Sequence, residues 1–167
     1  VSAFLLNRSS DLAIITKIGM AHLATFKTQE NIQKTKFELI ENLPDDGIGI
    51  LNGDDPLQRN YKIKNNCHIK WIGIDSDVVD VKASDISLSP EGCTFNVTFK
   101  DDKKKYKFET KLLGYNNIYN ILSAIALGKE FGMSTDQLKA GVAKVKPVEH
   151  RLELRPNPNG SIIIDDS

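Results

Sequence analysis

The first half of the chain contains short apolar runs separated by polar segments. The runs are Leu12–Ile18, Gly47–Asn52 and His68–Ile74. Continuous runs of this length are typical of strands buried on both faces of a parallel sheet. Thr28–Leu43, between the first two runs, has helical periodicity, with Thr28 as a possible N-cap and Pro44 as a stop signal. Strand, helix, strand, short helix and strand is the order of an α/β fold.

The middle of the chain, residues 76–112, has a different pattern. Its β-type segments are broken by "SPEG" and by the charged run "DDKKK", and they cover Val79–Leu88, Thr94–Lys100 and Lys105–Leu112. They predict a small antiparallel meander, with the charged run at a solvated hairpin tip.

The last third of the chain predicts two helices and a strand pair. The helix Asn116–Phe131 would bury one apolar face, made of Ile118, Ile121, Leu122, Ile125 and Ala126. Ser134 and Gln137 form a capping-box signal for a helix over Thr135–Val145. "HRLELRPNPNGSIIID" predicts two strands around a turn. The fold class is therefore α/β, with a mostly parallel sheet flanked by helices and a small antiparallel meander.

Composition narrows the function classes. The chain has 22 basic and 22 acidic residues, so no net charge favours a nucleic acid or an anionic membrane as a partner. No apolar segment is long enough to span a bilayer. Cys67 and Cys93 lack the spacing of a zinc site or a disulfide framework, which favours a reducing, cytoplasmic setting. Because the chain begins and stops abruptly around predicted elements, we expect it to be part of a larger protein.

His22 and Lys36 are the first candidates for chemistry. His22 follows the first predicted strand, where open α/β sheets bind ligands, and it could contact a metal or a phosphate, or be a solvated loop residue. On a helical wheel, Lys36 falls near the centre of the apolar stripe of its helix, which is formed by Ile32, Leu39, Ile40 and Leu43. A lysine there must snorkel, find a partner, lose its proton or be modified.

Amides and carboxylates supply the next candidates. Asn116 or Asn117 could cap the helix that follows Gly114, whereas Asn120 lies one turn inside it, where its amide could read a base edge. Asp54 and Asp55 in "LNGDDP" are interpreted as caps of a short helix.

Charged pairs flank the predicted strands near the end of the chain. His150 and Arg151 precede one strand and suit a phosphate. Asp165 and Asp166 end the other and suit a ribose hydroxyl or a metal. The sequence contains no GxxxxGK[ST], GxGxxG or GxSxG motif, so it has no evident phosphate cradle of its own.

Taken together, these segments resemble the central, ATP-binding domain of the Mur ligase family, over essentially the whole chain. The motifs that carry the resemblance occur in the family's order: "IGMAHL" with "ENIQKTK", "ILNGDDP", "LLGYNNIYNILSAIA", "VEHRLELR" and "IIIDDS". The form "IGMAHL" is most similar to the branch that adds D-alanyl-D-alanine. The resemblance implies a P-loop-type sheet. It also implies that the phosphate loop, an N-terminal UDP-binding domain and a C-terminal Rossmann-like domain lie outside residues 1–167.

The resemblance also implies roles for single residues. His22 matches a histidine that binds Mg²⁺, and Lys36 a lysine that is carbamylated and becomes an anionic metal ligand. Asn120 matches an asparagine that contacts adenine, Arg151 an arginine near the ATP phosphates, and Asp166 an aspartate that holds the ribose. Two positions depart from the family pattern: Lys17 stands where an asparagine is usual, and Asn116 where a histidine is usual.

The implied reaction is an ATP-dependent, ADP-forming amide ligation in the bacterial cytoplasm. UDP-MurNAc-tripeptide and D-alanyl-D-alanine would be joined through an acyl phosphate in peptidoglycan precursor synthesis, by a protein expected to be monomeric. Two alternatives stay open. One is another Mur-type or folylpolyglutamate-synthase-like ligase, and the other is a non-catalytic α/β binding domain, which Lys17 and Asn116 would favour.

Overall fold

The structure is a computed structural model that describes residues 11–20, 26–148, 152–157 and 161–165. It divides into two compact units, the first ending at Asp80 and the second beginning at Val81. His22, His150, Arg151 and Asp166 lie outside the described residues. No helix among the described residues is long and apolar enough to cross a membrane.

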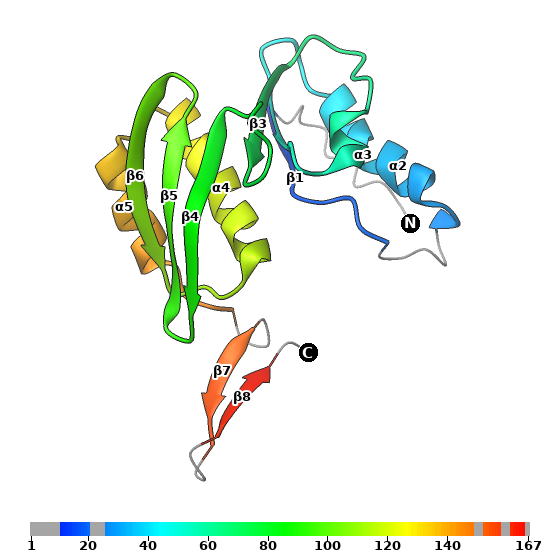
Figure 1. Ribbon diagram of the computed structural model, residues 1–167. Coiled ribbons are helices and arrows are strands. Elements are labelled where there is room, and N and C mark those ends of the chain that lie inside the picture. Colours follow the sequence, from blue (N-terminus) through cyan, green and yellow to red (C-terminus); the bar gives the residue numbers. More distant parts are fainter. Residues whose placement is uncertain (1–10, 21–25, 149–151, 158–160, 166–167) are drawn as a thin grey trace. The chain divides into compact units, whose positions relative to one another are not determined.

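The first unit contains the parallel part of the fold (Figure 1). Its strands β1 (Leu12–Ile15), β2 (Ile48–Asn52) and β3 (His68–Gly73) lie side by side in this order. Leu12 pairs with Ile48, and Ile48 with His68, so all three strands run in the same direction. Helices α2 (Gln29–Glu41) and α3 (Pro56–Arg59) connect them. The predicted α/β order of this half is confirmed.

Helix α2 supplies much of the core of the first unit. It starts as the sequence predicts, because the Thr28 side chain accepts a hydrogen bond from the backbone N–H of Asn31. Phe37 and Ile40 are fully buried, and Phe37 stacks on Tyr61 with ring centroids 3.7 Å apart. The predicted stripe was wrong at Leu39, which is 60% exposed. The buried face of α2 is centred on the side of Phe37 and Ile40, so Leu39 lies outside its edge.

The second unit combines the predicted meander with two helices. Strands β4 (Val81–Ser89), β5 (Gly92–Phe99) and β6 (Asp102–Thr110) are antiparallel, and α4 (Tyr115–Glu130) and α5 (Thr135–Lys144) cover one face of them (Figure 1). The five residues predicted for the apolar face of α4 are all buried, and the capping box of Ser134 and Gln137 is formed. Strands β7 (Glu153–Pro156) and β8 (Ile162–Asp165) pair antiparallel, as predicted.

Two local differences from the predictions in the second unit have identifiable reasons. Strand β6 begins at Asp102, inside the charged run, because Phe99 pairs with Asp102 across a turn of only two residues. Neither Asn116 nor Asn117 caps α4. The N-cap is Gly114, whose φ of 81° suits a residue without a side chain.

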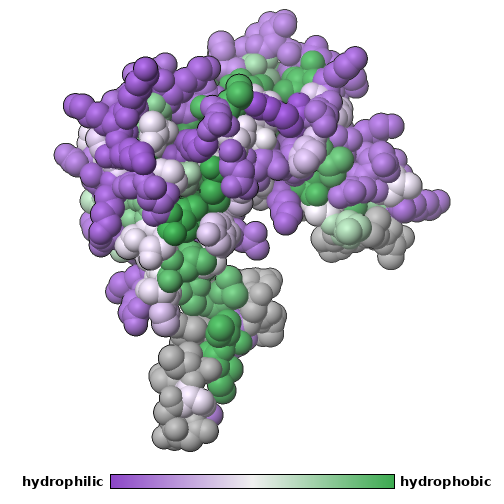
Figure 2. All heavy atoms as spheres, in the orientation of Figure 1, coloured by the Kyte–Doolittle hydropathy of each residue, from purple (hydrophilic) through white to green (hydrophobic). Residues whose placement is uncertain are grey.

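Hydrophilic side chains cover most of the surface seen in Figure 2. An apolar area runs along the β7–β8 pair, where Ile163 and Ile164 are exposed at 52% and 61%.

Candidate active site

The candidate site of the first unit lies just after β1, at the carboxyl ends of the parallel strands. The predicted strand over Leu12–Ile18 ends at Ile15, because the next residues bond to side chains instead of extending the sheet. The Thr16 carbonyl accepts from Asn52 Nδ2 at 3.1 Å, and the Lys17 carbonyl accepts from Lys36 Nζ at 2.6 Å. The Ile18 N–H donates to Asp55 Oδ2 at 2.9 Å. Three consecutive residues are thus held by three side chains, one from α2 and two from the segment that ends β2 and leads into α3.

Lys36 is where the sequence places it, on the buried side of α2. It projects between Ile32 and Ile40, which are both buried, and is itself half-buried. Its nitrogen reaches the Lys17 carbonyl, so the side chain extends from α2 to the segment after β1. That segment leads directly to His22. Gly19 lies on the way, and no described atom comes within 4 Å of a Cβ built on it.

The "LNGDDP" segment forms a buried polar network that the sequence did not reveal. Gln58 is fully buried, and its amide oxygen accepts from the Asn52 N–H at 2.8 Å while its Nε2 donates to Asp55 Oδ2 at 3.0 Å. Asn52 is also buried, and its Oδ1 accepts from the Asp54 N–H. Asp55 Oδ1 accepts from the Leu57 N–H, which makes Asp55 the N-cap of α3, as predicted.

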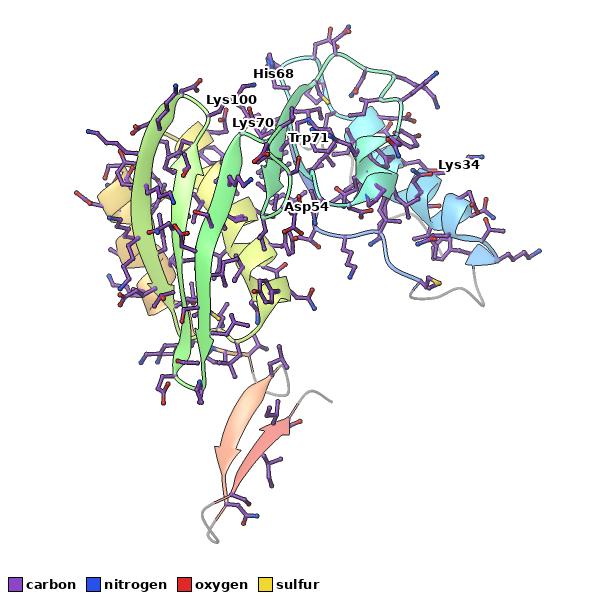
Figure 3. All side chains as sticks on the ribbon, viewed as in Figure 1. Lys34, Asp54, His68, Lys70, Trp71 and Lys100 are labelled. Carbon is purple, nitrogen blue, oxygen red and sulfur yellow. The ribbon has the colours of Figure 1, made fainter. Side chains whose placement is uncertain are left out.

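Asp54, in contrast, is not the cap of α3. Its carboxylate accepts hydrogen bonds from the backbone N–H groups of Ile74, Asp75 and Ser76, at 2.5, 3.1 and 2.7 Å. Figure 3 shows Asp54 beside the chain that leaves β3. The two neighbouring aspartates therefore hold different loops, Asp55 the one after β1 and Asp54 the one after β3.

Ionisable groups around α2 have shifted pKa values with clear causes. A backbone hydrogen bond and the Thr28 side chain lower the pKa of Glu30 at the start of the helix. Burial raises the pKa of the Tyr61 hydroxyl, which donates to Glu41 at 2.9 Å. Burial also raises the pKa of the Cys67 thiol, so Cys67 suits a core position rather than a nucleophile's role.

The donor set next to Lys36 bears on the magnesium site that the resemblance implies. Mg²⁺ prefers oxygen ligands, and a lysine amine offers none. Within the described ranges, no three His, Cys, Asp or Glu side chains gather in a way that could hold a metal. A carbamate on Lys36 would supply two oxygens, so this position would fit such a site only in the modified form.

In the second unit, Asn120 lies in the first turns of α4, as predicted, and is exposed. Its Nδ2 donates to Asn117 Oδ1 at 3.2 Å, and Asn117 Nδ2 donates to the Leu113 carbonyl at 2.9 Å. Asn117 therefore orients the Asn120 amide and ties it to the chain before the helix. Asp165 ends β8 opposite Glu153, directly before Asp166.

Comparisons with known proteins agree with this architecture. Residues 5–128 match the model of the Mur ligase middle domain. The UDP-N-acetylmuramoyl-tripeptide–D-alanyl-D-alanine ligase of Bacillus subtilis is 33% identical over 157 residues, which are 94% of this chain and 33% of that protein. A UDP-N-acetylmuramate–L-alanine ligase of Clostridium kluyveri is 28% identical over 93% of this chain and 34% of that protein. The chain spans about a third of the length of these curated relatives.

Solved structures show the same fold. A crystal structure of MurF from Acinetobacter baumannii superposes with a TM-score of 0.84 at 22% identity, over 95% of this chain and 34% of that one. MurF from Thermotoga maritima, solved in complex with ADP, gives a TM-score of 0.78 at 24% identity, over 94% of this chain and 35% of that one. The resemblance seen in the sequence motifs is confirmed, and the chain belongs to the Mur ligase family as a middle domain.

Proposed function

We propose that this chain is the middle part of an ATP-dependent, ADP-forming amide ligase that adds D-alanyl-D-alanine to UDP-MurNAc-tripeptide in the bacterial cytoplasm. The observation that carries the proposal is Lys36, a half-buried lysine whose nitrogen is held against the loop that leads to His22. Among the relatives, the higher identity of the B. subtilis D-alanyl-D-alanine ligase supports this branch. The phosphate loop and the flanking domains would belong to other parts of the same polypeptide, which acts as a monomer.

Lys36 and His22 would hold Mg²⁺, which supplies positive charge to the phosphates of ATP. The uncharged amine of Lys36 combines with carbon dioxide and releases one proton, which leaves a carbamate with the charge of a carboxylate. This modification explains a lysine on an apolar helix face, because the charge then faces a cation instead of apolar neighbours. Lys17 projects from an exposed position, so its own ammonium is not forced into the site.

Asn120, Arg151 and Asp166 would bind the nucleotide. The exposed amide of Asn120, oriented by Asn117, offers a donor and an acceptor to adenine. Arg151 would neutralise phosphate charge, and Asp166 would accept hydrogen bonds from the ribose hydroxyls.

In this reaction the substrate carboxylate attacks the γ-phosphorus of ATP, and ADP leaves. The amine of D-alanyl-D-alanine then attacks the carbonyl carbon of the acyl phosphate, and phosphate leaves. The protein forms no covalent bond, so its contribution is to position the reactants and to neutralise the phosphate charge.

The test is the reaction of the whole polypeptide that contains this chain. Phosphate release from ATP is measured with UDP-MurNAc-tripeptide and D-alanyl-D-alanine, and separately with UDP-MurNAc and L-alanine. We expect ligation with the first pair. We also expect Lys36→Ala to abolish this activity and Lys34→Ala to leave it unchanged. Lys34 is a matched control, because it projects from the same helix into solvent (Figure 3). We expect the isolated 167 residues to hydrolyse no ATP.

The second candidate is an L-alanine-adding ligase, which the C. kluyveri relative favours. Turnover with only the L-alanine pair would select it and refute the first proposal. No turnover with either pair, in a polypeptide that folds and binds ATP, would refute both candidates and leave a ligase with other substrates or a non-catalytic domain. The carbamate is tested separately, by ¹³C NMR of the protein in labelled bicarbonate, where Lys36→Ala removes the signal.

A further inference from the structure

We propose that Asp55 is a positioning residue for Lys36. Its carboxylate fixes the Ile18 N–H, and thereby the Lys17 carbonyl that receives the Lys36 nitrogen. The inference rests on the proposed function only in assigning chemistry to Lys36.

The geometry places Asp55 in the middle of a chain of contacts. Asp55 Oδ2 lies 2.9 Å from the Ile18 nitrogen, and the Lys17 carbonyl, one residue earlier, lies 2.6 Å from Lys36 Nζ. Lys17 and Ile18 share one peptide group, in which the carbonyl of Lys17 and the N–H of Ile18 point in opposite directions. Asp55 and Lys36 therefore hold the two sides of a single peptide plane.

Helix capping alone does not explain a carboxylate at this position. An N-cap needs one acceptor, and serine or asparagine fills that role as well as aspartate. Asp55 uses Oδ1 for the cap and Oδ2 for both the Ile18 N–H and Gln58 Nε2. Of the common capping side chains, only a carboxylate offers two acceptor oxygens, since serine and asparagine have one each. The orientation of Gln58 is set in turn, because its own oxygen accepts from the Asn52 N–H.

The Lys17 carbonyl can serve the Lys36 nitrogen before and after modification. An amine offers several hydrogens, and a carbamate keeps one on the nitrogen. The same acceptor thus orients the nitrogen in both states. If the peptide plane between Lys17 and Ile18 turned, this acceptor would be lost in both.

The test compares Asp55→Asn with the matched control Asp54→Asn in the 167-residue chain. In Asp55→Asn the new amide can still cap α3 through its oxygen, but it presents an N–H₂ group where two donors now point. Asp54→Asn weakens the loop over residues 74–76 and leaves the Ile18 contact in place. Two readouts are used: hydrogen exchange of the Ile18 amide, and competitive acetylation of Lys36 against Lys34.

In Asp55→Asn we expect the hydrogen-exchange rate of the Ile18 amide to rise by at least about tenfold. A rise of this size corresponds to the loss of one hydrogen bond to a charged acceptor. Acetylation of Lys36 relative to Lys34 should rise severalfold, by roughly three to ten times. Asp54→Asn should change neither value. Asp55→Ser, which keeps a capping oxygen but is too short to reach Ile18, should reproduce the effect if the asparagine variant does not fold.

An unchanged Lys36 to Lys34 ratio in both Asp55 variants would overturn the inference, as would an equal change in Asp54→Asn. Neither readout needs ATP, Mg²⁺ or a carbamate. A ligase assay that fails while both readouts respond would therefore refute the proposed function and leave the positioning role of Asp55 standing.

Discussion

Replacement of Gln58 by methionine tests whether one buried amide holds the first unit together. Methionine has a similar length but no group that replaces the amide. The change removes the acceptor of the Asn52 N–H, at 2.8 Å, and one of the two donors to Asp55 Oδ2, at 3.0 Å. Because Asn52 and Gln58 are buried, water cannot readily take the place of the lost partner.

The expected loss of unfolding free energy follows from these contacts. A buried N–H without a partner costs about 1–3 kcal/mol, and a hydrogen bond to a charged acceptor contributes about 1.5–3 kcal/mol. The greater hydrophobicity of methionine offsets part of this, about 1–2 kcal/mol. We expect a net loss of about 3 kcal/mol. With a urea dependence of about 1.5 kcal/mol per molar, the unfolding midpoint would fall by about 2 M.

The assay uses Trp71, the single tryptophan of the chain, whose fluorescence reports on the first unit. Gln33→Met is the control, because Gln33 makes one neutral contact, to the Leu57 carbonyl, and is half-buried. Its loss should be about 1 kcal/mol. Equal losses in the two variants, or a loss below about 0.5 kcal/mol in Gln58→Met, would refute the importance assigned to the buried network.

Three further predictions concern other parts of the molecule. Cys67 and Cys93 are buried, and burial raises the pKa of both thiols. A maleimide at neutral pH should therefore modify each thiol only when the unit that contains it unfolds. Modification at the rate of a free thiol would contradict this prediction. Lys17→Ala should change the unfolding free energy by less than about 0.5 kcal/mol and leave the acetylation of Lys36 unchanged, because Lys36 contacts the backbone of Lys17 and not its side chain. Acetylation is measured by mass spectrometry, and a rise at Lys36 would contradict this prediction. Hydrogen bonds from Lys105 and Asn96 lower the pKa of Asp85 in the folded protein below its ordinary value of 3.8. The ionised carboxylate therefore stabilises the fold above pH 3.8, and this stabilisation is lost as the pH falls through the pKa of the folded state. Asp85→Asn should therefore flatten the dependence of the second unit's stability on acid pH, measured as the hydrogen-exchange protection of backbone amides in β5, and an unchanged profile would contradict it.

Local signals predicted most elements of the fold. Thr28 caps α2, and Ser134 with Gln137 caps α5, because these signals depend on residues within one turn. Strand ends were less predictable. The apolar run continues to Ile18, which is buried, yet β1 ends at Ile15 because Asn52 and Asp55 bind the backbone beyond it. These partners lie 36 and 37 residues away, beyond the reach of periodicity.

The candidate site was predictable in part for the same reason. Lys36 stands out because its neighbours on the wheel are apolar, and the structure places it half-buried against Lys17. Gln58 carried only a weak signal, because it is a polar residue in the first turn of a short helix, and such residues are usually exposed. Its complete burial comes from partners on β2 and at the cap of α3. The roles of His22, Arg151 and Asp166 stay predictions from the family resemblance.

The position of "LNGDDP" in the sheet explains why two adjacent aspartates hold different loops. Strand β2 lies between β1 and β3, and in a parallel sheet all three strands end at the same edge. A segment that leaves β2 therefore passes between the loop after β1 and the loop after β3. Asp55 reaches the first through the Ile18 N–H, and Asp54 reaches the second through residues 74–76. Because Lys36 depends on the first loop alone, its reactivity should depend on Asp55 and not on Asp54, although the two residues are neighbours in the chain.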